Sequence, residues 1–208
     1  MRKIVCALFA TCLLLPLKAQ VTVSQKETPD AFCVARNSGG AAVYVSPAEH
    51  VLVGKVAGLF ADDVARVTGY RPDVKVSGKV STRQPVVVGT LGHNAFIDRL
   101  VKQGKVNAKA IRGGWERYVV QVVDKPAKGV DRALVVVGSD KRGAAYGLLS
   151  LSEMMGVSPY YWWADVPVEH KAAVWIAGSE TSKSPSVKYR GLFINDEDWG
   201  LKPWASKT

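Results

Sequence analysis

A short run of acidic and amide residues follows a hydrophobic stretch near the end of the sequence. Residues 187–194 have the apolar, β-branched and aromatic composition of a strand. Directly after it come Asn195, Asp196, Glu197 and Asp198. If this is the first strand of a parallel barrel, these side chains lie at its carboxyl end, where barrel enzymes place their active sites. A carboxylate there can bind sugar hydroxyls, orient water or act as a general acid or base. The alternative is a solvated acidic loop that caps the strand.

A second feature is a cluster of aromatic residues in a segment typical of a loop. Its members are Tyr160, Tyr161, Trp162 and Trp163. Such rings can form a platform on which a sugar ring stacks. More often they fill the interface between two packed domains, each ring burying about 150–250 Å². Both interpretations stay open, and the second is favoured.

Metal, phosphate and cofactor sites lack their usual signatures. His50, His93 and His170 are isolated, and none has the spacing of a zinc protease motif, so each is expected at the surface or at a helix cap. Residues 89–92 lack the lysine of a phosphate-binding loop and the three glycines of a dinucleotide site. We therefore expect no metal and no cofactor.

The elements that must position these groups alternate between strand and helix. After a strand over 41–45, the best-defined helix is predicted to begin with Ser46 as N-cap, Pro47 in the first position and Glu49 as the capping-box partner. Gly69 is expected to end it. Its apolar stripe consists of Leu52, Val56, Val64 and Val67, together with Leu59 and Phe60, both expected to be buried.

The rest of the pattern predicts a mixed sheet with packed helices. Strands are expected over 85–89, 116–123, 133–137 and 173–177, the second and third forming a hairpin around Pro126 and Gly129. One helix covers 94–103 and packs Phe96, Ile97, Leu100 and Val101. Another begins at Ser139 and Asp140, ends at Gly156 and has the stripe Ala144, Leu148, Leu151 and Met155. The nearly all-apolar strands imply a sheet with at least one covered face, and hence an α/β fold class.

Composition and charge restrict the class of protein. The chain has 208 residues, of which 48% are hydrophobic and 22% charged, which excludes a disordered or low-complexity protein. It is shorter than the roughly 250 residues of a complete (β/α)₈ barrel. The net charge is +10. Its basic residues are dispersed rather than clustered, so we expect no nucleic-acid partner.

Residues 1–19 have the features of a secretory signal peptide. Two basic residues precede an apolar stretch over 4–17, and Ala19 stands before an expected cleavage at Gln20. The stretch is shorter than the roughly 20 residues of a membrane span, so we expect export to the periplasm or the extracellular medium and no membrane span. Cys33 would then be the one remaining cysteine, so no internal disulfide is possible, and we expect it to be a small buried apolar residue.

These features divide the chain into five predicted segments. They are a signal peptide over 1–19, a leader over 20–30, an N-terminal α/β accessory domain over 31–178, a linker over 179–186, and the start of a truncated catalytic (β/α)₈ barrel over 187–208.

Three motifs carry a family resemblance: SDKRGAAYGL over 139–148, GVSPYYWWADVPV over 156–168 and KYRGLFINDEDWGL over 188–201. Together they closely resemble glycoside hydrolase family 115, whose members are xylan α-glucuronidases. The resemblance runs from about Phe32 to the end. It implies that this chain is the N-terminal portion of a longer enzyme, with an α/β domain followed by a (β/α)₈ barrel and C-terminal domains.

The resemblance also implies a reaction and a substrate. The reaction is inverting hydrolysis, without a cofactor, of the α-1,2 link between (4-O-methyl)glucuronic acid and xylose. The substrate is acidic xylan or a glucuronoxylo-oligosaccharide. Only the first-strand motif can be carried over, which makes Asp196 and Glu197 the catalytic candidates and Asn195, Trp199 and Arg190 the substrate-binding candidates. Arg190 could instead form a structural pair with an acidic residue.

Other expectations follow from the missing barrel strands. Much of the family's catalytic apparatus lies on later strands, so the remaining catalytic groups are expected beyond Thr208, and the 208-residue chain alone is expected to be inactive. A homodimer through C-terminal domains is a further expectation.

Two other classes of protein compete with this interpretation. One is a non-catalytic carbohydrate-binding module for acidic polysaccharide, motivated by the aromatic cluster and the basic charge. The other is a nucleic-acid binder, which would bind DNA with a steep salt dependence.

Overall fold

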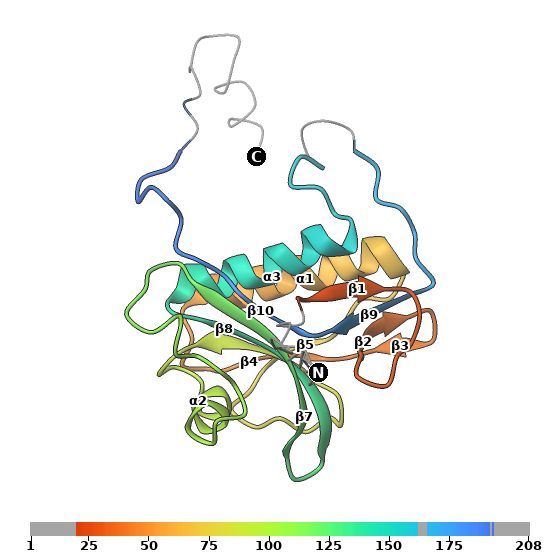
Figure 1. Ribbon diagram of the computed structural model, residues 1–208. Helices are drawn as coiled ribbons and strands as arrows, with labels where there is room; N and C mark the ends of the chain where they lie inside the picture. Colours follow the sequence, from red (N-terminus) through yellow and green to blue (C-terminus); the bar gives the residue numbers. More distant parts are fainter. Residues whose placement is uncertain (1–19, 162–165, 192, 194–208) are drawn as a thin grey trace, which may run out of the picture.

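The computed structural model describes residues 20–161, 166–191 and 193, which form a mixed α/β fold (Figure 1). The predicted α/β class is confirmed. In chain order the elements are β1 (Thr22–Ser24), β2 (Phe32–Arg36), β3 (Gly39–Gly40), β4 (Val43–Val45), α1 (Val51–Thr68), β5 (Val74–Val76), β6 (Val86–Thr90), α2 (Ala95–Lys102), β7 (Tyr118–Ala127), β8 (Val130–Gly138), α3 (Lys141–Met155), β9 (Ala173–Ala177) and β10 (Ser179–Thr181).

A six-stranded mixed sheet forms the centre of the molecule, with strand order β10-β7-β8-β6-β4-β5. Strands β5, β4, β6 and β8 run parallel, whereas β7 is antiparallel to β8 and β10 is antiparallel to β7. In register, Val43 pairs with Val86 and Val86 with Leu134. The hairpin of β7 and β8 is confirmed and is longer than the sequence predicted.

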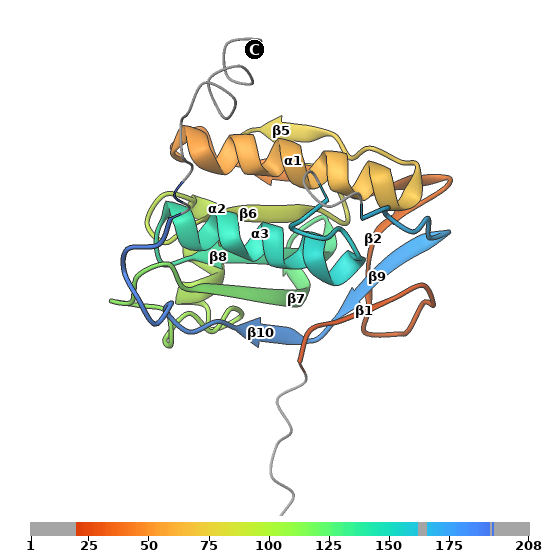
Figure 2. The same ribbon diagram turned by 90° about the horizontal axis from the view of Figure 1, so that it is seen from above.

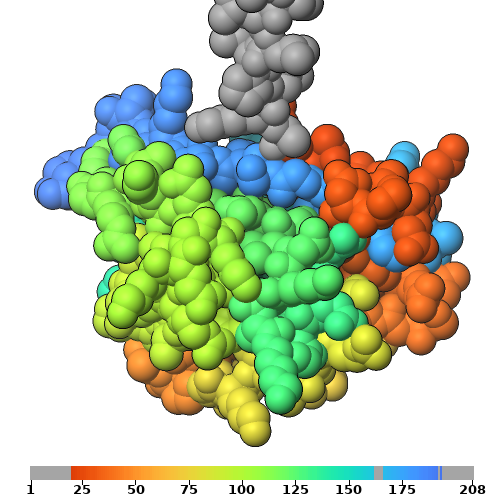
Figure 3. Space-filling view, turned by 60° about the horizontal axis from the view of Figure 1, so that its bottom comes forward, coloured from red at the N-terminus to blue at the C-terminus, as the bar shows by residue number. Residues whose placement is uncertain are grey.

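Helices cover both faces of this sheet (Figures 1 and 2). On one face α1 and α3 lie side by side over Val43, Val86 and Leu134. On the other face α2 packs against Tyr44, Val87 and Val135. Figure 3 shows this second face, where the yellow-green residues around α2 lie beside the tip of the β7–β8 hairpin. Because successive side chains of a strand point to opposite faces, burial on both faces requires apolar side chains in the consecutive buried positions 43–45, 86–88 and 133–137 of β4, β6 and β8.

A second, four-stranded sheet with order β1-β9-β2-β3 lies beside the first. Its inward side chains, Phe32, Val34, Val174 and Ile176, join the core beneath α1 and α3. Two expectations are corrected here. The leader over 20–30 contains β1, in which Val23 pairs with Ile176, and the linker over 179–186 contains β10, in which Glu180 pairs with Val120. Both strands are three residues long, too short to show a periodic pattern.

Helix α1 begins four residues later than predicted. His50 is the N-cap, and its Nδ1 accepts a hydrogen bond from the Leu52 N–H at 3.1 Å. Ser46 instead accepts from the Ala48 N–H in a local turn. Glu49 reaches across to accept from the Thr90 N–H at 2.6 Å, so it is not a capping-box partner. The predicted role of His50 as a surface or capping residue is confirmed.

The other helix signals are confirmed. Asn94 caps α2, Asp140 caps α3, and Gly69 and Gly156 end α1 and α3 with left-handed backbones. None of the helices in the described ranges combines the length and apolarity needed to cross a membrane.

The strand expected over 187–194 is absent from the residues described there. Residues 187–191 and 193 have no strand assignment, and Ile194 lies outside the described residues. A strand is stable only when a neighbouring strand takes up its backbone hydrogen bonds. No strand in the described part of the chain pairs with this segment.

Helix α1 provides a test of the core. Phe60 is fully buried, so we expect Phe60→Ala to lower the free energy of unfolding by about 3–5 kcal/mol. Leu59, predicted to be buried, is instead 48% exposed because it lies at the outer edge of the stripe, and Leu59→Ala should cost no more than about 1 kcal/mol. Urea unfolding of both variants measures the difference. Equal denaturation midpoints for the two variants would contradict this placement of the core.

Candidate functional site

The carboxyl ends of the parallel strands meet at one edge of the central sheet, where α1 and α3 also begin (Figure 1). His50 and Lys141, which flank the two helix starts, lie 3.2 Å apart between Nε2 and Nζ. In α/β proteins this edge is where loops bring polar side chains together. Several carboxylates and cations of this chain converge there.

Asp140 connects two of the loops at this edge. Its Oδ1 accepts hydrogen bonds from the Arg142 and Gly143 N–H groups, at 3.0 and 2.8 Å, and so caps α3. Its Oδ2 accepts from the Glu116 N–H at 2.7 Å. One carboxylate thereby fixes both the start of α3 and the loop that leads into β7.

Glu116 is a buried carboxylate in this loop, and sequence reasoning did not identify it as a site residue. Its backbone is left-handed, with φ 55°, and its side chain is 6% exposed. Arg142 Nη1 donates to its Oε1 at 2.9 Å, and Arg190 Nη2 donates to its Oε2. Hydrogen bonds from these two guanidinium groups hold the pKa of Glu116 below its ordinary value.

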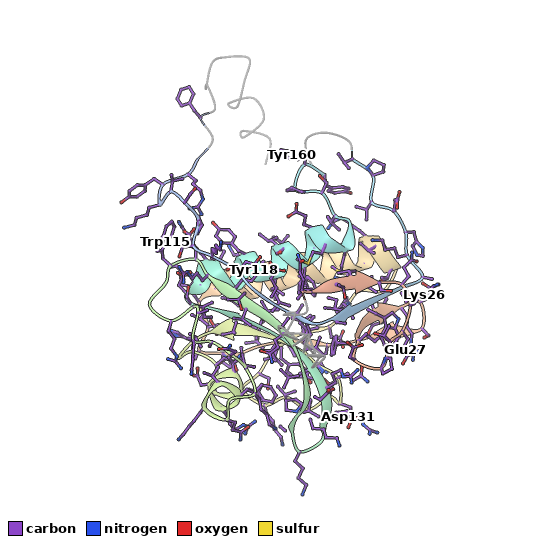
Figure 4. The ribbon with its side chains drawn as sticks, in the orientation of Figure 1. Lys26, Glu27, Trp115, Tyr118, Asp131 and Tyr160 are labelled. Atoms are coloured by element: carbon purple, nitrogen blue, oxygen red, sulfur yellow. The ribbon has the colours of Figure 1, made fainter. Side chains whose placement is uncertain are left out.

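Arg190 is the predicted site residue that the structure describes, and it is bound on several sides. Besides its pairing with Glu116, its Nη2 lies 3.2 Å from the Tyr146 hydroxyl and its Nη1 donates to the Val187 carbonyl at 2.7 Å. Its guanidinium lies 5.8 Å from the Trp115 ring centre. Figure 4 shows Trp115 beside the start of α3, next to the descending C-terminal segment. The acidic partner considered for Arg190 is therefore Glu116, and its role toward substrate stays a prediction.

A hollow of about 450 Å³ opens next to this ion-pair cluster. Arg142, Lys188 and Arg190 form its basic rim, and Tyr146 and Leu149 of α3 contribute to its wall. Tyr189 on the rim is 86% exposed. The arrangement combines cations with an apolar and aromatic wall, a composition suited to a polar ligand or to another protein segment.

Glu49 is another carboxyl at the same edge, and it is half-buried. Its Oε1 accepts from the Thr90 N–H, which ties the end of β4 to the end of β6. Burial raises the pKa of Glu49 above its ordinary value. Gly89 permits this approach, because a Cβ at Gly89 would lie 2.6 Å from Glu49 Oε1.

The remaining predicted site residues lie outside the described residues. They are Asn195, Asp196, Glu197 and Trp199. Thr208 lies outside the described residues too. The placement of further catalytic groups beyond Thr208 therefore stays a prediction.

The aromatic cluster is described only in part. Trp162 and Trp163 lie outside the described residues. Of the other members, Tyr160 is 65% exposed, and Tyr161 lies 5.1 Å from the Arg66 guanidinium (Figure 4). The sugar platform and the domain interface both stay predictions.

Two further observations concern metal and thiol chemistry. Within residues 20–161, 166–191 and 193, no group of three or more His, Cys, Asp or Glu side chains converges as a metal site would. Cys33 is half-buried on β2, and burial raises the pKa of its thiol.

Glu116→Gln tests the charge of the ion-pair cluster. The folded-state pKa of Glu116 lies below its ordinary value of 4.5, so its ionised form stabilises the fold at neutral pH and this contribution is lost as the pH falls through the folded pKa. We expect Glu116→Gln to lower the melting temperature at neutral pH. The gap to the parent should stay constant down to about pH 5 and close in more acidic solution.

Thermal unfolding followed by circular dichroism measures this gap across the pH range. Arg83→Gln is the control, because Arg83 is 80% exposed and its ion pair with Asp131 lies elsewhere on the surface. Its melting temperature should follow that of the parent. A Glu116→Gln gap that widens in acid would contradict the lowered pKa.

Comparison with known proteins gives two matches that support a family assignment. The model of glycosyl hydrolase family 115 matches residues 182–208. A solved structure of a family GH115 4-O-methyl-α-glucuronidase, BtGH115A, described as having specificity for decorated arabinogalactans, is 34% identical. The match covers 81% of this chain and 20% of that one, with a TM-score of 0.65. This chain thus spans about a fifth of the length of that enzyme.

Two more distant structural similarities are too weak to support a conclusion about this chain. The structure of CpGH84D is 11% identical over 78% of this chain and 23% of that one, with a TM-score of 0.45. The N-acetyl-β-hexosaminidase of Streptomyces plicatus, in complex with Thio-NAglucal, is 14% identical over 85% of this chain and 27% of that one, with a TM-score of 0.44. No curated protein matches the chain in sequence. The family model and the 34%-identical structure agree with each other, and the chain belongs to glycosyl hydrolase family 115.

Proposed function

We propose that the complete protein removes (4-O-methyl)glucuronic acid from acidic xylan by hydrolysing its α-1,2 link to xylose. The observation that carries this proposal is the position of the family match. It covers residues 182–208, the segment that holds Asp196 and Glu197. The 34%-identical relative is a 4-O-methyl-α-glucuronidase, which supports the bond and the sugar. That relative is described as having specificity for decorated arabinogalactans, so the polysaccharide backbone of this protein's substrate needs its own test.

We propose an inverting mechanism that uses no cofactor. Inversion requires a general acid and a general base about 6.5–9.5 Å apart with a water molecule between them. Asp196 and Glu197 are adjacent in sequence, and neighbouring side chains of an extended segment point in opposite directions. One of the two would face the scissile bond, so the opposed carboxyl group would come from a segment of the complete protein beyond Thr208. The 208-residue chain alone is then expected to be inactive.

The substrate-binding candidates have roles that suit a charged sugar. An arginine can hold a uronate carboxylate through two parallel hydrogen bonds, an amide such as Asn195 can bind a hydroxyl, and an indole such as Trp199 can stack on a pyranose ring. Arg190 is 35% exposed beside the hollow of α1 and α3, so part of its side chain is accessible although Glu116 and Tyr146 contact its Nη2.

Export and assembly complete the proposal. Acidic xylan is a large polysaccharide outside the cell, which agrees with an export signal over 1–19. We also propose that C-terminal domains of the complete protein form a homodimer. A purely non-catalytic carbohydrate-binding module is not favoured, because the family is one of hydrolases.

Replacement of the candidate carboxylates tests the function. In the complete protein, alanine at whichever of Asp196 and Glu197 faces the scissile bond should lower kcat/KM on aldouronic acids from glucuronoxylan by about 100-fold or more, the scale of a general acid or base. Glucuronic acid release is followed by anion-exchange chromatography, and NMR of the first-formed anomer tests inversion. Asp131→Asn, at an exposed position of the β7–β8 hairpin, is the matched control and should keep parental kinetics.

Three outcomes would contradict parts of this proposal. Parental kinetics in the double variant Asp196→Ala with Glu197→Ala would remove these residues from the site. Turnover by the 208-residue chain itself would show that no further segment is needed. Release from a glucuronate-bearing arabinogalactan but not from glucuronoxylan would overturn the xylan backbone and retain the α-glucuronidase activity.

A further inference from the structure

We propose that Glu116 is a positioning residue, which acts through Arg190 to hold the segment leading into Asn195, Asp196 and Glu197. The inference rests on the proposed function, because it assigns importance to those three residues. Its structural basis is independent of that function, since Glu116, Arg190 and their contacts all lie in the described part of the chain.

Glu116 is held in a conformation that an ordinary loop residue would avoid. A left-handed backbone at a residue other than glycine is unfavourable and persists only where the surroundings enforce it. Here two contacts enforce this conformation. The Asp140 carboxylate accepts a hydrogen bond from the Glu116 N–H, and the Arg117 peptide packs closely against the start of α3. A Cβ at Gly143 would lie 2.1 Å from the Arg117 carbonyl oxygen, so only glycine at 143 allows the loop this close.

The buried Glu116 side chain then faces two cations of different kinds. Arg142 belongs to the first turn of α3 and is 60% exposed. Arg190 belongs to the C-terminal segment and is 35% exposed. Asp140 is needed to cap α3, and Gly143 is needed for the close packing of the loop. By contrast, nothing in the described domain core requires Arg190, the second cation. Ser182 and Ser184 hold the start of the segment after β10 by hydrogen bonds to Tyr118 and Arg117. The pairing with Arg190 adds an attachment further along, next to the candidate residues.

Arg190 supplies the polar attachment of residues 187–191 and 193 to the domain. Among residues 187–191 and 193, the hydrogen bonds and ion pairs to the rest of the fold all come from the Arg190 side chain, to Glu116 and Tyr146. The segment's large apolar residues are exposed: Val187 at 55%, Tyr189 at 86% and Phe193 at 93%. Lys188 interacts with the ring of its neighbour Tyr189, inside the segment.

Anchoring Arg190 restricts where the candidate site can lie. Asn195 is five residues further along, and a fully extended chain spans at most about 3.6 Å per residue, so Asn195 stays within about 18 Å of the anchored Cα. A displacement of about 1 Å at reacting groups can cost about 100-fold in rate. Release of Arg190 should therefore impair the chemical step more than substrate affinity.

The first experiment measures how firmly Glu116 holds Arg190 in the 208-residue chain. Trypsin must take the Arg190 side chain into its own pocket, so cleavage after Arg190 requires release from Glu116. We expect Glu116→Gln to speed this cleavage about tenfold, as local opening becomes easier, with cleavage after the exposed Lys128 unchanged. Arg142→Gln is the matched control, because it removes the other guanidinium from Glu116 and leaves Arg190 paired. Peptide mass spectrometry follows each site separately.

The second experiment measures the consequence in the complete protein. Glu116→Gln and Arg190→Gln should each lower kcat about 10- to 100-fold with a smaller change in KM, and the double variant should be no worse than either single variant. Arg142→Gln should cause a clearly smaller loss, and Glu116→Asp should recover part of the activity. Arg190→Gln lies on an exposed segment, so it keeps the test valid if Glu116→Gln fails to fold.

The outcomes separate this inference from the proposed function. Unchanged cleavage after Arg190, losses in Glu116→Gln no larger than in Arg142→Gln, or additive losses in the double variant would overturn the positioning role. A rise in KM alone would also overturn it. An inactive parent protein would overturn the proposed glucuronidase activity and, with it, the expected loss of kcat in the variants. The trypsin result would still decide whether Glu116 holds the segment.

Discussion

The carboxylate of Asp140 is the interaction on which the polar edge of this molecule depends. One oxygen satisfies the first N–H groups of α3, and the other holds the N–H of Glu116. A helix start leaves N–H groups without internal partners, and an aspartate cap is worth about 1 kcal/mol for that reason alone. Here the same group also imposes the loop conformation that points a buried carboxylate at Arg142 and Arg190. Helix capping and the attachment of the C-terminal segment thus share one residue.

A second constraint comes from the central sheet, which is buried on both faces. The buried stretches of β4, β6 and β8 are apolar on both faces because α1 and α3 cover one side and α2 the other. Polar groups of the loops converge at the edge where the parallel strands end. Glu49, Asp140 and Glu116 all lie near this edge, and each uses its carboxylate to join elements that are distant in sequence.

The chain belongs to a family of glycoside hydrolases and spans about a fifth of the length of its 34%-identical relative. What the described fold contributes is therefore a scaffold beside the proposed catalytic segment. Strand β10 closes the edge of the sheet next to β7, and its continuation is fastened by Ser182, which donates its N–H to the Tyr118 carbonyl at 2.9 Å. The family match begins at this point, residue 182.

Sequence alone determined the parts of this protein in which the signal is local. The stripe and caps of α3, the cap of α2, the left-handed glycine after α1 and the β7–β8 hairpin were all predictable, because capping, helical periodicity and turns involve residues a few positions apart. The motif over 188–201 was sufficient to suggest the family. The sequence also suggested two roles for Arg190, substrate binding or pairing with an acidic residue.

Only the tertiary structure decided the features that depend on residues far apart in the chain. Strand β1 exists because β9, about 150 residues later, provides its partner, and β10 exists because β7 has a free edge. Leu59 follows the helical spacing yet is half-exposed, since neighbouring elements determine which side of the stripe is covered. Glu116 carries no local signal at all. Its role arises from Asp140, Arg142 and Arg190, which are 24, 26 and 74 positions away and which only folding brings to one carboxylate.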